Sequence, residues 1–338
     1  AASDVYKRQF KDSEAVTLGS LFRIWENENE NLWIPYINCA EDKMILEKYY
    51  LMQGRMAAGK VDRETGELRL LNTVPTFGAD PCYVATNGRE VLTANYSGGT
   101  MSVFPLQKDG TLAPADTLFQ GSATGPDAIR QATPHIHCTV FSPDGKYIFA
   151  TDFSADRILR FVMHPDNPIP HASLEAVGIE ADSGPRHLTF SPNGKFAYLI
   201  TELSGKVIAF SYDDGCLEQI QTITADTVAA RGSADIHLSP DGKYLYASNR
   251  LKEDGIAIFA VNPENGTLAK VGYQPTGIHP RNFNITPNGK YLLAACRDSN
   301  VIQVYKRNEV TGLLEDTHQD IVVDMPVCVQ FVSSVNNL

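Results

Sequence analysis

The sequence predicts an all-β fold, a seven-bladed β-propeller with four-stranded antiparallel blades. Two observations support this prediction. A phrase of the type Phe-Ser-Pro-Asp-Gly-Lys-Tyr recurs at 141–147, 190–196, 238–244 and 285–291, with a weaker copy at 85–91. The glycines of the four full copies, at 145, 194, 242 and 289, are 49, 48 and 47 residues apart. A period of roughly 40 to 50 residues built from short strands is typical of one propeller blade per repeat.

Each copy of the phrase is expected to join two strands in a hairpin. The Asp-Gly or Asn-Gly pair provides the positive φ that a tight turn needs. Residues before the turn alternate in polarity, as at 187–190, and residues after it are β-branched, aromatic or small, as at 147–151. A third strand follows, and a Gly-x-Leu pattern, as at 215–217, opens a fourth.

The two ends of the chain are expected to close the ring. Residues 325–332 repeat the start of a blade, 46 residues after the preceding copy, and provide a single innermost strand. Pairing of that strand with N-terminal strands would remove the open edges and complete one domain over 1–338. Residues 1–60 depart from the repeat and are expected to be irregular or non-native in part. Residues 107–134 are expected to form a surface loop near one mouth of the channel.

Composition narrows the classes of function. With 40 acidic and 29 basic residues the net charge is −11, which disfavours nucleic acid or an anionic membrane as the main partner. No run reaches the roughly 18 apolar residues that span a bilayer. The six cysteines contain no Cys-x-x-Cys pair, so no zinc site is expected, and neither a metal nor a cofactor is predicted. Their scatter suits a reducing compartment, and the expected location is the cytoplasm. The oligomeric state is not predicted.

Fixed distances along the sequence from each turn also predict which residues form the site. The innermost and second strands of a blade are antiparallel, so the start of one and the end of the other lie at the same mouth of the channel. Seven residues back from the Asp or Asn of each turn, and eight forward from its glycine, should therefore meet there. These positions hold His137, Arg186 and Arg281 on innermost strands and Glu202, Arg250 and Arg297 after second strands, with His135, His187 and Asn249 as neighbours.

This set points to a small anionic ligand. Arginines gathered at one opening repel each other unless an anion is present, and the planar guanidinium suits phosphate and carboxylate. Each residue alone has a simpler interpretation: Arg250 as the partner of a loop carboxylate, His137 as a structural histidine, Glu202 as half of a salt bridge. Their joint occurrence at equivalent repeat positions favours a functional site. Asp152 and Asp156 carry carboxylates of the kind that bind metals, but no oxygen-rich loop accompanies them, so no metal site is expected there.

Six motifs carry a family resemblance: Ala-Asn-Tyr-Ser-Gly-Gly at 94–99, Pro-His-Ile-His at 134–137, Gly-Pro-Arg-His-Leu at 184–188, Thr-Glu-Leu at 201–203, Ala-Ser-Asn-Arg at 247–250 and His-Pro-Arg-Asn-Phe at 279–283. With them, residues from about 64 to 332 resemble the lactonase family of seven-bladed propellers, typified by bacterial 6-phosphogluconolactonase and related to the fungal carboxy-muconate cyclase. The resemblance implies hydrolysis of 6-phosphogluconolactone to 6-phosphogluconate in the pentose phosphate pathway. The catalytic residues that it implies are His137, Arg186, Glu202 and Arg250.

The expected mechanism is metal-free ester hydrolysis. Glu202, or His137 with its help, takes a proton from the water that attacks the lactone carbonyl, while Arg186 and Arg250 stabilise the oxyanion. The residues expected to bind substrate are His135, His187, Asn249, Arg281 and Arg297. Two alternatives stay open: another lactonase or muconate-type cycloisomerase acting on a small anion, and a non-catalytic propeller that binds a protein partner.

Overall fold

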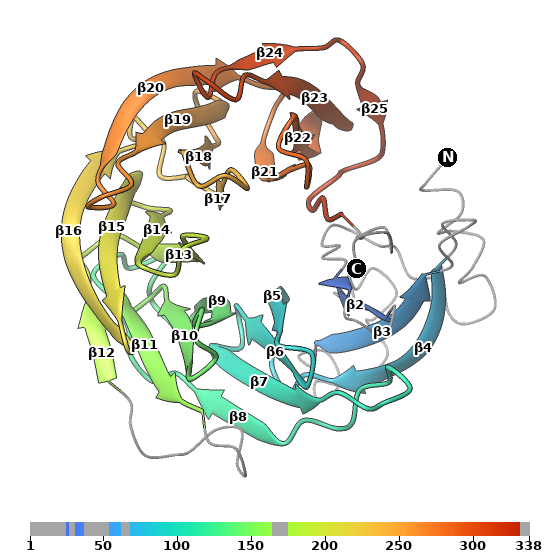
Figure 1. The fold of residues 1–338 in the computed structure, drawn as a ribbon. Helices are drawn as coiled ribbons and strands as arrows, with labels where there is room; N and C mark the ends of the chain where they lie inside the picture. The colour runs from blue at the N-terminus through green and yellow to red at the C-terminus, as the bar shows by residue number, and fades with distance from the viewer. Residues whose placement is uncertain (1–24, 27–30, 37–53, 62–67, 164–174, 332–338) are drawn as a thin grey trace.

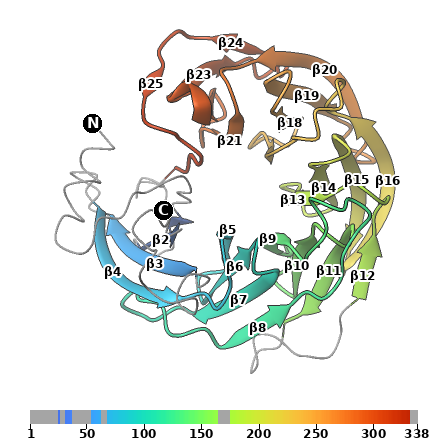
Figure 2. The same cartoon turned by 180° about the vertical axis from the view of Figure 1, so that it is seen from behind.

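The computed structural model describes residues 25–26, 31–36, 54–61, 68–163 and 175–331. In this part of the chain, short antiparallel strands form six sheets arranged as blades around a central channel (Figure 1). The same ring is seen from behind in Figure 2. None of the described residues belongs to a helix long and apolar enough to cross a membrane.

Strands in each sheet follow the order of the chain from the channel outward, as the repeat predicts. The first sheet consists of β1 (Trp25–Glu26), β2 (Asn31–Tyr36), β3 (Arg55–Val61) and β4 (Leu68–Pro75). The second consists of β5 (Pro81–Thr86), β6 (Glu90–Asn95), β7 (Thr100–Pro105) and β8 (Thr117–Gln120). The third consists of β9 (Ile136–Phe141), β10 (Tyr147–Asp152), β11 (Arg157–Val162) and β12 (Glu175–Gly178).

The remaining three sheets repeat this plan. The fourth consists of β13 (Pro185–Phe190), β14 (Phe196–Thr201), β15 (Lys206–Asp213) and β16 (Cys216–Thr224). The fifth consists of β17 (Ile236–Leu238), β18 (Tyr244–Asn249), β19 (Gly255–Val261) and β20 (Leu268–Pro275). The sixth consists of β21 (Pro280–Ile285), β22 (Tyr291–Cys296), β23 (Val301–Arg307) and β24 (Leu314–Asp316), and β25 (Ile321–Val322) also pairs with β23; a short 3₁₀ helix, η1 (Arg297–Ser299), follows β22.

The recurring phrase forms the hairpin turn between the first two strands of a blade. In the third sheet the Gly145 N–H donates to the Ser142 carbonyl at 3.0 Å, and Gly145 has φ of 69°. The Asp144 carboxylate accepts the Lys146 N–H at 3.0 Å and the Ser142 hydroxyl at 2.5 Å, which holds the turn closed. Because Asp144 is not at positive φ, this is a type I turn ending on a left-handed glycine, and not a turn with two positive-φ residues.

A bulge recurs where the innermost strand begins. In the second, third, fourth and sixth sheets, one residue of β5, β9, β13 and β21 is skipped in the pairing with the second strand. The skipped residues are Cys82, His137, Arg186 and Arg281. A bulge bends the strand and redirects a side chain, and these four residues line the central channel.

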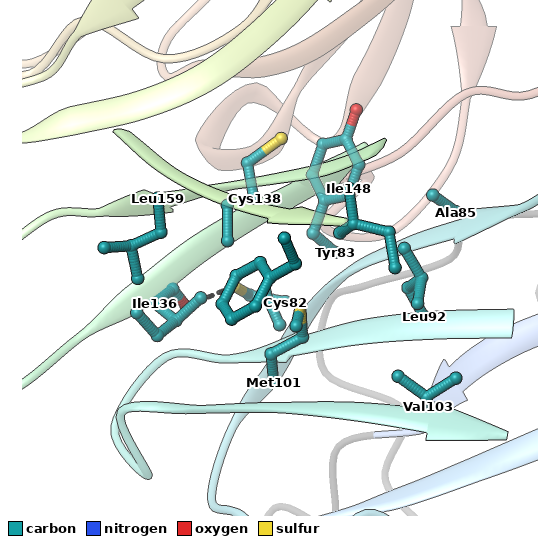
Figure 3. Packing of buried hydrophobic residues seen from close by; sticks show 13 residues of the cluster. Cys82, Tyr83, Ala85, Leu92, Met101, Val103, Ile136, Cys138, Ile148 and Leu159 are labelled. Atoms are coloured by element: carbon teal, nitrogen blue, oxygen red, sulfur yellow. Dashed lines mark hydrogen bonds between the residues drawn. The ribbon is translucent and has the colours of Figure 1, made fainter. Parts of the chain in front are cut away.

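Apolar side chains fill the space between neighbouring blades. Figure 3 shows the packing of the second sheet on the third, where Leu92 and Met101 lie in one cluster with Ile136, Cys138 and Ile148. These five side chains are fully buried, which makes Cys138 part of the apolar core. Packing of this kind holds the innermost strands, and hence the channel residues, in fixed positions.

The C-terminal segment lies beside the sixth sheet. The Val329 N–H donates to Asn282 Oδ1 at 2.6 Å, and the Val329 carbonyl accepts from Asn284 Nδ2 at 3.0 Å. This segment therefore flanks β21, but the expected closing strand is not formed among the described residues: residues 325–331 are not a strand and do not pair with β1, β2 or β3. Within residues 1–60, the described strands β1, β2 and β3 belong to the first sheet.

Candidate active site

A pocket of about 360 Å³, part of it open to solvent, lies in the channel where the innermost strands begin. Its wall comes from two successive positions of these strands and from the C-terminal segment: Cys82, Tyr83, His137, Arg186, His187, Arg281, Asn282, Val327 and Cys328. Four residues predicted from the repeat, His137, Arg186, His187 and Arg281, thus share one cavity. The bulges explain why they point inward although they come from three different blades.

Glu202 follows β14 and is held by three guanidinium groups. Arg186 Nε donates to Glu202 Oε2 at 2.8 Å, and Arg250 Nη2 lies 3.2 Å from the same oxygen. Arg130 Nη2 donates to Oε1 at 2.5 Å. Burial alone would raise the pKa of this carboxyl, but the three guanidinium charges, with Arg250 first among them, outweigh burial and lower it to about 2. Glu202 is therefore a fixed anion and a poor proton acceptor.

Arg130 was not predicted, and the structure adds it to the site. It lies in the loop expected near the mouth, 107–134, where its backbone N–H donates to Asp127 Oδ1 at 2.9 Å. The buried Gln131 side chain ties the same loop to the third sheet by donating to the Phe153 carbonyl at 2.9 Å. Because this loop lies outside the repeat, counting from the turn cannot reach Arg130. The one feature of the sequence that pointed to Arg130 is its place in 107–134, the loop expected near the mouth of the channel.

His187 bridges Arg186 to a buried aspartate. His187 Nδ1 lies 2.7 Å from Asp235 Oδ1, and His187 Nε2 lies 3.1 Å from Arg186 Nη1. A guanidinium can only donate, so Nε2 accepts the bond from Arg186, and the ring proton lies on Nδ1 facing Asp235. Asp235 also accepts from His237 Nε2 at 3.0 Å and from the Asn282 amide. Burial would raise the pKa of Asp235, but His237 and His187 outweigh it and hold that pKa well below its usual value.

Like Arg186, Arg250 contacts Glu202, a histidine and a backbone carbonyl, but it faces Glu202 with Nη2 and not with Nε. Its Nη1 lies 3.0 Å from His279 Nε2, and its Nε donates to the Gly232 carbonyl at 2.9 Å. His279 Nδ1 lies 3.1 Å from Asp298 Oδ2. Arg250 is 4% exposed, and burial lowers its pKa, as do the charges of neighbouring arginines. Asp235, His279 and Asp298 were not predicted as site residues, although each lies one or two residues from a counted position, as the predicted neighbours His135, His187 and Asn249 do.

Arg281 differs from the other site arginines in its partners. Its guanidinium makes no hydrogen bond and no ion pair with any residue in the described part of the chain. It lines the pocket at the bulge of β21. Burial, and then the charge of Arg186, lower its pKa to about 10, so the group stays charged at pH 7. A half-buried cation that faces a cavity without a counter-ion is suited to receive an anion.

His137 is neutral in the pocket wall. Burial, and then the charge of Arg186, lower its pKa well below the usual 6.5. Its ring centre lies 5.1 Å from that of His187 and 5.2 Å from that of Tyr96. A neutral imidazole retains a lone pair at pH 7, so His137 is able to accept a proton in this cavity.

Three predicted binding residues do not line the pocket. His135 Nδ1 lies 2.8 Å from the Ser154 hydroxyl oxygen. Asn249 is buried with its amide used internally: Oδ1 accepts from the Ser233 hydroxyl at 2.6 Å, and Nδ2 donates to a backbone carbonyl at 3.2 Å. Arg297 forms a two-pronged contact with Asp298, at 2.6 and 3.2 Å.

The two aspartates considered as metal ligands make other contacts. Asp152 Oδ2 lies 3.0 Å from Arg157 Nη2. Asp156 accepts the backbone N–H groups of Ser183 and Gly184 at 3.0 and 2.8 Å, which fixes the loop just before β13. Among the residues that the structure describes, no group of three or more acidic, histidine or cysteine side chains is arranged to hold a metal ion.

The profile of the lactonase family, described as a seven-bladed β-propeller, matches residues 39–331, so the chain belongs to this family and its fold class is confirmed. A 6-phosphogluconolactonase of Formosa agariphila is 37% identical over 83% of this chain and 82% of its own.

Solved structures agree with this assignment. A Bacteroides uniformis protein proposed to be a 6-phosphogluconolactonase is 86% identical, covers 95% of this chain and 90% of its own, and superposes with a TM-score of 0.87. A periplasmic gluconolactonase of Pseudomonas aeruginosa is 32% identical, covers 93% of this chain and 88% of its own, and gives a TM-score of 0.82.

Proposed function

We propose that the protein hydrolyses 6-phospho-D-glucono-1,5-lactone to 6-phosphogluconate, as a carboxylic ester hydrolase of the pentose phosphate pathway. The observation that carries this proposal is the charge of the site. Three guanidiniums, those of Arg130, Arg186 and Arg250, pair with one carboxylate, Glu202, and a fourth, that of Arg281, lines the pocket nearby without a partner among the described residues. The excess positive charge in and beside the pocket, two of whose lining residues are Arg186 and Arg281, favours a substrate that brings its own negative charge.

The phosphate of the substrate is the group best matched to Arg281. A phosphate ester carries about −1.5 to −2 charges at pH 7 and offers three acceptor oxygens. Arg281 lines the pocket and is without a partner among the described residues, so a phosphate oxygen replaces water there and not a protein carboxylate. Arg297, the other candidate from the sequence, is already paired with Asp298 and contributes charge from outside the pocket.

In the proposed mechanism His137 acts as the base. A water molecule attacks the lactone carbonyl carbon and gives its proton to His137. Arg186 and Arg250 stabilise the oxygen that becomes negative, an interaction worth roughly 3 kcal/mol for one well-placed donor. The tetrahedral intermediate then breaks the bond from the carbonyl carbon to the ring oxygen, which receives the proton back from His137. Glu202, with its pKa of about 2, fixes the arginines and takes no proton.

One comparison favours a second substrate. The Pseudomonas aeruginosa relative is named a gluconolactonase, and it is 32% identical to this chain. An unphosphorylated sugar lactone needs the carbonyl chemistry of the site but no phosphate partner. The two substrates therefore differ in how strongly their hydrolysis depends on Arg281.

The proposed location is the cytoplasm. A sugar phosphate is charged and does not cross a bilayer unaided, so its lactone is hydrolysed in the compartment where it forms. Fractionation of cells that express the tagged full-length protein tests this, since enrichment in the periplasmic or extracellular fraction contradicts it.

The deciding experiment is a lactonase assay with both substrates. Each lactone is added to the purified protein, proton release is followed over time, and the spontaneous rate without protein is subtracted. We expect faster turnover of the phosphorylated lactone. Equal rates support a general gluconolactonase, and no rate above the spontaneous background for either lactone refutes the proposed function.

A further inference from the structure

Two Asp–His–Arg chains with the same order of contacts meet at Glu202, which Arg186 faces with Nε and Arg250 with Nη2. In the first, Asp235 contacts His187 and His187 contacts Arg186, at 2.7 and 3.1 Å. In the second, Asp298 contacts His279 and His279 contacts Arg250, at 3.1 and 3.0 Å. Each arginine then reaches Glu202 Oε2, at 2.8 and 3.2 Å. The family resemblance accounts for the arginines and Glu202 but leaves the histidine–aspartate pairs without a role.

The hydrogen-bond directions in both chains are fixed by chemistry. A guanidinium has donors only, so each histidine Nε2 that faces an arginine must accept. The proton of each ring therefore lies on Nδ1, where a carboxylate accepts it. Asp235 and Asp298 thus select the tautomer, and His187 and His279 offer a neutral acceptor to Arg186 and Arg250.

A neutral acceptor has an advantage that a carboxylate lacks. A second carboxylate beside Arg186 or Arg250 would orient the guanidinium but would also cancel its charge. A histidine orients it equally and leaves the charge for the substrate. The negative charge of Asp235 and Asp298 lies one imidazole ring further away, where it repels a bound anion less.

We propose that His187 and His279, each oriented by its own aspartate, are positioning residues that hold Arg186 and Arg250 in the orientation needed at the anionic transition state. The inference rests on the proposed lactonase function. His279 gives the cleaner test because it does not line the pocket, whereas His187 does. The backbone N–H of His279 donates to Asp254 Oδ1 at 3.1 Å. This bond holds the backbone of His279 at a left-handed φ of 63°.

Two substitutions of His279 separate its hydrogen-bonding role from its bulk. In His279→Gln the amide oxygen accepts from Arg250 and the amide N–H donates to Asp298, so both bonds are retained. In His279→Leu both are lost. We expect kcat for the lactone to fall on the order of 10- to 100-fold in the leucine variant, as for one lost hydrogen bond to a charged group, and to stay within about threefold of wild type in the glutamine variant. KM should change less than kcat in both, because the bond matters most when charge develops.

The acid limb of the pH profile gives an independent readout. Burial lowers the pKa of His279 to about 4, with Arg250 and Arg297 adding to the effect and Asp298 opposing it. The other charged groups nearby are Asp254 and Arg281. Below pH 4 His279 binds a proton at Nε2 and can no longer accept from Arg250, so wild-type kcat falls there. Protonation of His137 lowers kcat at acid pH in both proteins. Glutamine does not titrate, so the glutamine variant should lack only the additional fall due to His279 and should have the shallower acid limb.

Several outcomes overturn the inference. They are wild-type kcat in a folded leucine variant, equal losses in the glutamine and leucine variants, and an unchanged acid limb in the glutamine variant. If the leucine variant does not fold, Asp298→Ala provides the second test, because it leaves His279 free to change tautomer; we expect about a tenfold loss of kcat, and an unchanged kcat contradicts the inference. If the wild type hydrolyses no lactone, calorimetric binding of 6-phosphogluconate replaces kcat: weaker binding in the leucine variant than in the glutamine variant supports positioning, and equal binding refutes it.

Discussion

Arg186 and Arg281 occupy the same position in two blades but have opposite surroundings. Each is the bulged residue that follows the proline opening an innermost strand, β13 or β21. Arg186 donates to Glu202, contacts His187 and donates to the Ala234 carbonyl at 2.6 Å. Arg281 has no partner among the described residues. The repeat thus determines where an arginine lies, and the neighbouring blades determine whether its guanidinium is also held by protein groups or faces the cavity alone.

The largest loss of activity should follow a change at Glu202, the carboxylate that holds Arg186. Glu202→Gln removes the carboxylate that three guanidiniums share, so we expect at least a 100-fold loss of turnover and a lower Tm, since unpaired buried charges cost roughly 3 to 5 kcal/mol. Thermal unfolding and the lactonase assay measure both. Glu180→Gln is the matched control, because Glu180 pairs with Lys206 at the surface and should change neither. An unaltered rate in Glu202→Gln would contradict its role.

At Arg281, which has no partner among the described residues, Arg281→Met should alter the preference for the phosphorylated lactone. We expect kcat/KM for the phosphorylated lactone to fall on the order of 10- to 100-fold, because one charge-assisted contact to phosphate is lost. Hydrolysis of unphosphorylated gluconolactone should change less than about threefold. Parallel assays of the two lactones measure the ratio. Equal losses on both would show that Arg281 acts on the lactone carbonyl and not on the phosphate.

Acid pH should reduce the contribution of Glu202 and its paired arginines to the stability of the fold. The pKa of Glu202 is about 2 in the folded protein and about 4.5 without neighbours, so its stabilising contribution is complete above pH 4.5 and is lost as pH falls through 2. Wild-type Tm should therefore decline over this window. Glu202→Gln, already less stable, should decline less. Identical slopes for the two proteins, measured by calorimetry, would mean that other carboxyls such as Asp235 dominate the acid response.

The smallest effect is expected at Arg297, which is bound like Arg186 but lies outside the pocket. Its guanidinium is paired with Asp298, and its side chain is 30% exposed. Arg297→Met should change kcat/KM less than about threefold on either lactone, as expected of an exposed pair. A loss as large as that of Arg281→Met would place Arg297 in contact with the phosphate, and steady-state kinetics would detect it.

Local chemistry made much of the fold predictable. The short Pro-Asp-Gly phrase specifies the hairpin turn by itself. Counting a fixed number of residues back from that turn identified His137, Arg186 and Arg281 as channel residues. The same count found Glu202 and Arg250 but could not assign their partners, because these come from loops and from other blades. Arg130 lies in a loop outside the repeat. Asn249 was predicted to bind substrate, yet its amide is used by Ser233 and a carbonyl, a pairing set by folds of the chain that no spacing encodes.

The bulge at the start of the innermost strand has a consequence for how such a site changes over time. The skipped residue takes no part in the ladder, so one backbone conformation accepts different side chains: the four positions carry a thiol, an imidazole and two guanidiniums. At Arg281, which has no partner among the described residues, an exchange of the side chain should alter what the cavity recognises and leave the strand pairing unchanged. At Arg186 the same exchange would also remove a partner of Glu202, so new substrates are most easily reached by change at the first position.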